Sequence, residues 1–148
     1  MIVEKLRELG YEYTPAGKKT LAFHSATKVG NLVFTSGQVP RLNDEIIFGK
    51  VDSEVDLETA KKAAEICAFN CLRAAGAVVD VERIKRVVKV LGMVNVSDDF
   101  NRTSEVINGC TDFLNKIFGA ENSHARSAVG LTLPNNFAVE IEMIFEIE

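Results

Sequence analysis

The segment from Arg126 to Glu148 reads RSAVGLTLPNNFAVEIEMIFEIE, and it decides the fold. From Val139 onward, apolar and acidic residues alternate with a period of two, and Ile144 is the one exception. This period is typical of a strand that buries one face. The buried face would carry Val139, Ile141, Met143, Phe145 and Ile147, and the exposed face Glu140, Glu142, Glu146 and Glu148. The pattern predicts a strand that lies against the core.

A second strand-like run, residues 126–133, comes just before, and Pro134-Asn135-Asn136 separates the two runs. Pairing them as a hairpin across this turn sets Leu133 opposite Phe137, Ala128 opposite Glu142 and Gly130 opposite Glu140. One face would then hold Arg126, Ala128, Gly130, Glu140 and Glu142, and the other Val129, Leu131, Val139 and Ile141. We therefore expect a guanidinium and carboxylates around a space left by small residues, which suits a polar ligand.

Farther upstream, apolar periodicity and turn residues predict the remaining elements. Helices are expected over residues 2–9, 57–75 and 98–118, the last two capped by Asp56 and Ser97. Strands are expected over residues 20–27, 31–36 and 84–96, with a turn at 28–30 and a weak strand at 46–49. Two long helices on one face of a mixed sheet predict a two-layer α/β (α+β) sandwich.

The chain is expected to be one domain over residues 1–148, in which residues 1–20 form an N-terminal extension with a short helix. The uncovered face of the sheet would still carry apolar residues, such as Leu32 and Phe34 or else Val33. Monomers avoid such faces, so we expect an oligomer whose sheets enclose a shared interior.

Composition and charge restrict the class of protein. Hydrophobic residues make up 47% and charged residues 26%, as in soluble globular proteins. A net charge of −4 disfavours general nucleic-acid binding, which needs a basic surface. Apolar runs stay well short of 18 residues and the first residues lack a signal-peptide pattern, so the sequence predicts a cytoplasmic protein that does not enter a membrane.

The cysteines and histidines do not suggest a metal site. An odd number of cysteines (Cys67, Cys71, Cys110) argues against a disulfide framework. Cys67 and Cys71 share a helix face, where small core residues are the simpler interpretation than a metal pair. His24 and His124 lie in other segments and fit no zinc spacing, so they are expected to be structural or surface groups. We expect neither a metal nor a cofactor.

Three blocks of sequence resemble a known family. They are GNLVFTSGQVP at residues 30–40, LRAAG at 72–76, and the run from Ala125 through Leu133-Pro134 to Glu142. On these motifs the chain resembles the Rid family of reactive intermediate imine/enamine deaminases, also called the L-PSP endoribonuclease family. The resemblance implies a chorismate-mutase-like fold and a homotrimer with a central barrel and three clefts between subunits.

The resemblance also implies roles for particular residues. The family arginine that binds the substrate carboxylate corresponds to Arg126, and the glutamate that orients the hydrolytic water corresponds to Glu140. Backbone groups near Gly37 would line the cleft, and Asn108 corresponds to an asparagine that is often part of the site. From the residues alone, Arg126 could instead form a structural salt bridge, and Glu142 competes with Glu140. Gly37 could simply be a turn glycine and Asn108 a solvated helix residue.

Two departures from the family pattern affect the pocket. Members active on 2-aminoacrylate usually carry a cysteine where this chain has Ala128, and a family tyrosine corresponds to Phe23. With the longer N-terminal segment, these differences indicate a divergent subgroup. They leave the physiological substrate open.

The resemblance implies an enzyme that hydrolyses small 2-imino or enamino acids to 2-keto acids and ammonia without a cofactor. The alternative is a non-catalytic trimer that binds small carboxylates in the same cleft. A third possibility, an endoribonuclease or translation inhibitor, is disfavoured by the acidic charge.

Overall fold

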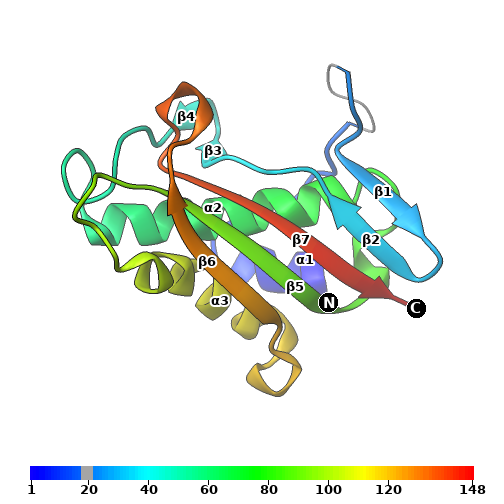
Figure 1. Cartoon of the computed structure of the whole chain (residues 1–148). Coiled ribbons are helices and arrows are strands. Elements are labelled where there is room, and N and C mark those ends of the chain that lie inside the picture. Colours follow the sequence, from blue (N-terminus) through cyan, green and yellow to red (C-terminus); the bar gives the residue numbers. More distant parts are fainter. Residues whose placement is uncertain (18–21) are drawn as a thin grey trace.

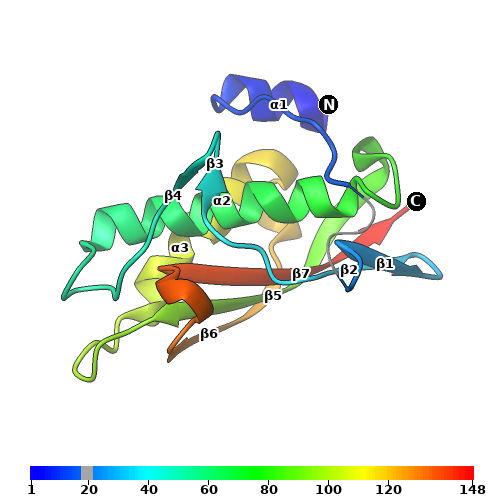
Figure 2. The ribbon, with the colours of Figure 1, turned by 90° about the horizontal axis from the view of Figure 1, so that it is seen from above.

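The structure, a computed structural model, describes residues 1–17 and 22–148. A mixed five-stranded sheet has the order β1-β2-β7-β5-β6, and α2 and α3 cover one of its faces (Figures 1 and 2). The predicted two-layer α+β sandwich is therefore confirmed. The helices are α1 (Ile2–Glu8), α2 (Leu57–Ala75) and α3 (Thr103–Phe118). The strands of the sheet are β1 (Ala26–Val29), β2 (Leu32–Thr35), β5 (Ile84–Asn95), β6 (Ala125–Leu131) and β7 (Val139–Ile147).

The predicted strands are present with shifted ends. β1 and β2 are joined at Gly30, which has a φ of +58°, and β1 extends to Val29, so the predicted turn at 28–30 began too early. Residues 20 and 21 of the strand expected over 20–27 lie outside the described residues. In place of the weak strand expected over 46–49, a short hairpin pairs β3 (Arg41–Leu42) with β4 (Glu45–Ile46).

The long helices differ in how well their ends were predicted. α2 covers the expected residues, and the Asp56 carboxylate accepts a hydrogen bond from Thr59 N at 2.8 Å. The predicted start of the next helix at residue 98 is wrong, because α3 begins at Thr103. The Ser97 hydroxyl lies 3.5 Å from the carbonyl oxygen of Val51, so it does not cap the helix. None of the described helices has both the length and the hydropathy needed to span a membrane.

The two helices pack backbone against backbone at Gly109. A Cβ atom at this position would lie 2.1 Å from the carbonyl oxygen of Lys61. Only glycine permits this approach, which brings both helices down onto the sheet. All three cysteines are buried beneath them as free thiols, as expected of core residues.

The predicted C-terminal hairpin is wrong. β5 lies between β6 and β7, parallel to the first and antiparallel to the second. A 3₁₀ turn at Pro134–Asn136, with Asn135 and Asn136 both at positive φ, carries the chain across β5 instead of folding it back beside β6. β5 is apolar enough to occupy the centre of the sheet, and α3 supplies the crossover that a parallel β5–β6 pair requires.

This order separates the groups that the hairpin would have placed together. Arg126 is opposite Val90 and Ala128 is opposite Gly92. The side chains of these residues lie on the face of the sheet that the helices cover. Glu140 is opposite Met93 and points to the other face. The predicted common face of Arg126 with Glu140 and Glu142 is therefore wrong, whereas the buried face predicted for residues 139–147 is confirmed.

The face of the sheet away from the helices carries exposed apolar side chains together with Glu140 and Glu142. Its exposed large side chains are Val29, Phe34, Val129 and Leu131. Half-buried Leu32, Leu91 and Ile144 lie on the same face. This agrees with the expected apolar second face.

The N-terminal extension is part of the core. α1 lies over the outer side of the helical layer (Figure 2) and buries Ile2 and Leu6. Tyr11 is buried with its ring 4.6 Å from that of Phe69 and 5.3 Å from that of Phe113. Burial raises the pKa of Tyr11 to about 12, with a further contribution from its hydrogen bond to Glu65. The extension thus packs onto both long helices.

Candidate active site

Arg126 lies on the edge strand β6 and reaches α3. Its Nη1 donates to Asn108 Oδ1 at 2.8 Å and to Thr111 Oγ1 at 3.0 Å. Its Nη2 makes a longer contact of 3.4 Å with the carbonyl oxygen of Ser104. The structure therefore brings Arg126 and Asn108 together, as the site prediction requires, although the side chain packs on a helix.

The guanidinium keeps one edge available. Both Nη1 hydrogens are used by α3, and one Nη2 hydrogen faces Ser104. Nε and the second Nη2 hydrogen have no hydrogen-bond partner among the described residues. These two N–H groups point in parallel, which is the arrangement that binds a carboxylate in two hydrogen bonds. The salt bridge considered for Arg126 is not found in the described part of the chain.

Thr111 links Arg126 to His124. Thr111 Oγ1 accepts from Arg126 Nη1 at 3.0 Å and lies 3.0 Å from His124 Nε2, within hydrogen-bond distance. Burial, followed by the charge of Arg126, lowers the pKa of His124, which favours the neutral imidazole. A neutral ring places no second positive charge beside the guanidinium. His124, expected to be a structural or surface group, therefore supports Arg126.

Sequence reasoning missed Ser104, Thr111 and His124 as partners of Arg126. A signal was present for two of them, because Ser104, Asn108 and Thr111 recur at helical spacing and form a polar stripe on one face of α3. Ala128 follows Arg126 on the same side of β6, and its carbonyl accepts from Thr103 Oγ1 at 3.1 Å. We call Arg126, Asn108, Thr111 and Ala128 the arginine cluster.

The second group of predicted residues surrounds Glu140 on the opposite face. A Cβ atom at Gly37 would lie 2.3 Å from Glu140 Oε2, so the glycine allows the carboxylate to rest against the backbone. Two backbone hydrogen bonds between Gln38 and Ile141, of 2.8 and 3.0 Å, hold the two segments together. Gly37 is thus a contact of Glu140 and more than a turn residue.

The environment of Glu140 strengthens it as a base. The side chain is half-buried, and burial raises its pKa, with a further contribution from Glu142 on the same face. A carboxylate with a raised pKa accepts a proton from water more readily. Glu142 is exposed and borders a shallow hollow of about 250 Å³ with Lys89, Leu91 and Ser127. Burial therefore favours Glu140 over Glu142 as the base.

Phe23 is linked to the segment that carries Gly37 through the backbone of its neighbour His24. It is 59% exposed, and it precedes His24, whose carbonyl accepts from Ser36 Oγ at 2.6 Å, next to Gly37. We call Phe23, Gly37 and Glu140 the glutamate cluster. The predicted residues thus fall into two groups, and neither group contains both Arg126 and Glu140.

The two clusters are too far apart to hold one small ligand within one chain. Arg126 is opposite Val90 and Glu140 is opposite Met93, so the two side chains start three residues, or about 10 Å, apart along β5. Strands β6 and β7, which carry them, lie on either side of β5 and are about 10 Å apart across the sheet. They also face opposite sides. Groups of three or more residues that could bind a metal ion are absent from the described part of the chain.

Comparisons with known proteins agree with this architecture. The chain matches the family model Endoribonuclease L-PSP over residues 16–147. Protein TCP17 of Trypanosoma cruzi is 32% identical over 99% of this chain and 94% of its own length. The crystal structure of Atu1372 from Agrobacterium tumefaciens, described as of unknown function, is 36% identical with a TM-score of 0.89, covering 99% and 92% of the two chains. A putative endoribonuclease from Shewanella oneidensis shares the fold, with 22% identity, a TM-score of 0.88 and 99% coverage of both chains.

Proposed function

Since the chain belongs to the Endoribonuclease L-PSP family and has its chorismate-mutase-like fold, we propose that it is a hydrolytic deaminase of small 2-imino or enamino acids. We further propose that it acts as a homotrimer. The observation that carries the proposal is the division of the site into two clusters, each with one group that the reaction needs. A second copy of the chain would bring the glutamate cluster of one subunit to the arginine cluster of its neighbour.

The chemistry follows from these groups. The free edge of Arg126 binds the carboxylate of the substrate, and Asn108 and Thr111 hold the guanidinium in place. Glu140 takes a proton from water, whose oxygen adds to the C=N carbon of the imine. The carbinolamine then expels ammonia after its nitrogen accepts a proton, and a 2-keto acid remains. An enamine enters the same path once its terminal carbon is protonated.

The exposed apolar face of the sheet supports the trimer. Phe34 on β2 and Val129 and Leu131 on β6 are each more than a third exposed, and burying such side chains between subunits would stabilise an assembly. Association of three sheets would cover this face and create inter-subunit clefts at the sheet edges.

A second candidate function is a non-catalytic trimer that binds small carboxylates. Ala128 and Phe23 favour it, because the thiol and the phenol of the related enzymes are missing at these positions. Turnover separates the two functions. The deaminase converts freshly generated 2-aminoacrylate to pyruvate and ammonia faster than buffer does, whereas the binder only slows its decay or leaves it unchanged.

Complementation tests the division of the site directly. Arg126→Ala and Glu140→Gln should each be inactive alone. When equal amounts are unfolded together and refolded into mixed trimers, about a quarter of the clefts should combine an intact Arg126 with an intact Glu140 from a neighbour. Restored activity near this level supports the shared site. If the mixed trimers stay inactive while the parent recovers after the same treatment, the proposed site is wrong.

A further inference from the structure

His124 lies beside the arginine cluster and shares a hydrogen-bonding atom with it. It comes just before β6, two residues ahead of Arg126, and both side chains reach α3. Thr111 Oγ1 lies 3.0 Å from His124 Nε2 and 3.0 Å from Arg126 Nη1. Because both nitrogens contact the same oxygen, they are at most twice this distance apart. His124 is therefore the ionisable side chain nearest to the guanidinium through this link.

This arrangement accommodates a protonated imidazole without rearrangement. A threonine hydroxyl has two lone pairs, so Thr111 Oγ1 can accept from Arg126 and from a protonated His124 at the same time. Neither Arg126 nor His124 forms a salt bridge within the described residues. Protonation of His124 would thus place two cations on one oxygen, with no carboxylate of the described chain to balance them.

Other charged side chains of the elements around His124 lie on different surfaces. They are Asp112 and Lys116 on α3, Lys89 on β5, and Glu121 in the 3₁₀ turn Ala120–Asn122. The two on α3 line a hollow between this helix and α2, and the one on β5 borders the hollow on the opposite face of the sheet. The carboxylate in the turn lies against the backbone of Gly119. Arg126 is thus the charge that acts on His124 among the described residues.

A carboxylate on the free edge of Arg126 would supply the missing negative charge. With hydrogen bonds of ordinary length to Nε and Nη2, it would lie on the order of 10 Å from the imidazole. Opposite charges attract at this separation, so a bound carboxylate favours the protonated ring and the protonated ring favours the bound carboxylate. We propose that His124 is a second, proton-dependent cation of the carboxylate site, and that the site binds a 2-keto acid more tightly when the imidazole is protonated.

The inference rests on the proposed function in one respect, the binding of a carboxylate at Arg126. Burial and the charge of Arg126 lower the pKa of His124 in the free protein, and a bound carboxylate raises it again. The gain in affinity is therefore complete below the pKa of the free protein and is lost as the pH rises through the pKa of the complex. In a deaminase the 2-keto acid is the product, so a neutral imidazole favours its release.

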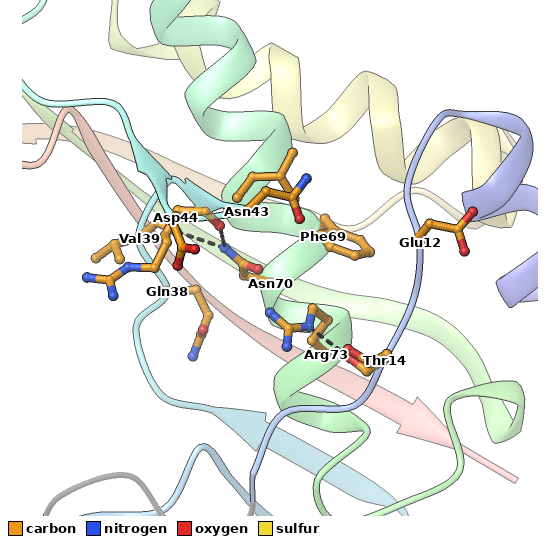
Figure 3. A pocket seen from close by; sticks show the side chains of 11 residues that line it. Glu12, Thr14, Gln38, Val39, Asn43, Asp44, Phe69, Asn70 and Arg73 are labelled. Carbon is orange, nitrogen blue, oxygen red and sulfur yellow. Dashed lines mark hydrogen bonds between the residues drawn. The ribbon is translucent and has the colours of Figure 1, made fainter.

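A second arginine offers a matched control. Arg73 borders a pocket of about 410 Å³ that joins residues 12–14 of the N-terminal extension to Asn70 and the β3–β4 hairpin (Figure 3). Glu12 and Asp44 line the same pocket, and their negative charges disfavour a carboxylate there. Arg73→Ala should therefore leave both the binding of 2-ketobutyrate and its pH dependence unchanged.

Nuclear magnetic resonance measures the coupling directly. The chain has two histidines, so His124→Gln assigns the imidazole signals of His124 and His24. The Glu140→Gln protein is the parent for these measurements, because it lacks the other titrating group of the proposed site. Saturating 2-ketobutyrate should move the titration midpoint of His124 to higher pH. By reciprocity, the affinity should rise about 3- to 10-fold between about pH 7.5 and a pH below that midpoint at low ionic strength, and molar salt should reduce the gain.

His124→Gln in the same parent separates the charge from the hydrogen bond. Glutamine keeps a polar group near Thr111 but does not titrate, so binding should persist and lose its pH dependence. Three results would overturn the inference while leaving the proposed site intact, provided that Arg126→Ala abolishes binding. They are a midpoint that does not move, an imidazole that stays neutral down to about pH 5 in the complex, and equal pH dependence with and without His124. Absence of binding in the parent, or binding that survives in Arg126→Ala, would refute the proposed carboxylate site and the inference with it.

Discussion

Replacing Arg126 tests the proposed site where its structure is most specific. Arg126→Ala removes the free Nε/Nη2 edge that would hold a substrate carboxylate. Each hydrogen bond between charged groups contributes about 1.5–3 kcal/mol, and partial exposure reduces the pair to a total of about 2–4 kcal/mol. The affinity for 2-ketobutyrate should therefore fall about 30- to 1000-fold. Arg126→Lys should recover only part of this loss, because lysine cannot form the parallel pair.

Titration calorimetry with 2-ketobutyrate measures this effect. Asn108→Ala removes one of the two acceptors that hold Nη1, so a smaller loss of about 3- to 10-fold is expected, corresponding to roughly 1 kcal/mol. Lys116→Ala is the matched control, since it removes an exposed cation from the same helix without touching Arg126. If Arg126→Ala binds the keto acid as tightly as the parent while remaining folded and trimeric, the carboxylate site is not at Arg126.

Three other predictions follow from the same geometry. Glu140→Gln should abolish turnover while preserving keto-acid binding. Because burial raises the pKa of Glu140, the folded parent loses stability as the pH rises from about 4.5 through that raised pKa. Urea unfolding should therefore show that Glu140→Gln is more stable than the parent at pH 7 and as stable as the parent below pH 4.5. Equal stability of the two proteins at both pH values would contradict this. Gly109→Ala should destabilise the fold by about 1–2 kcal/mol, as overpacking against Lys61 outweighs the gain in helix propensity, whereas Gly17→Ala, with open space around it, should be neutral in the same measurement. Light scattering at micromolar concentration should give about three times the 16.2 kDa chain mass, and a clean monomer would exclude the shared cleft.

Local patterns in the sequence were sufficient for many elements of the fold. The alternation over residues 139–147 predicted β7 and its buried face, because period two is a property of the strand itself. Asp56 predicted the start of α2, because a cap acts within one helical turn. The prediction that Ser97 caps the next helix was wrong, because its hydroxyl contacts Val51, a residue far away in the sequence.

The candidate site shows where local reasoning failed. The motif around Arg126 and the polar stripe of α3 are local, and Arg126 does meet Asn108 in the structure. The side of the sheet on which Arg126 lies depends on which strand lies beside β6. Proximity in sequence suggested β7, but the neighbour is β5, which comes before α3. With β5 instead of β7 beside β6, Arg126 faces α3 and Glu140 lies on the other face of the sheet.

The sequence by itself determined most of the elements, the apolar faces and the candidate site residues, because these depend on neighbours within a few residues along the chain. Only the tertiary structure decided the strand order, the separation of Arg126 from Glu140 and the pocket that joins residues 12–14 to Asn70 and Arg73. The physical reason is that hydrophobic burial has no direction. It specifies that a face must be covered, whereas backbone pairing across the whole sheet and close contacts such as that of Gly109 with Lys61 select what covers it.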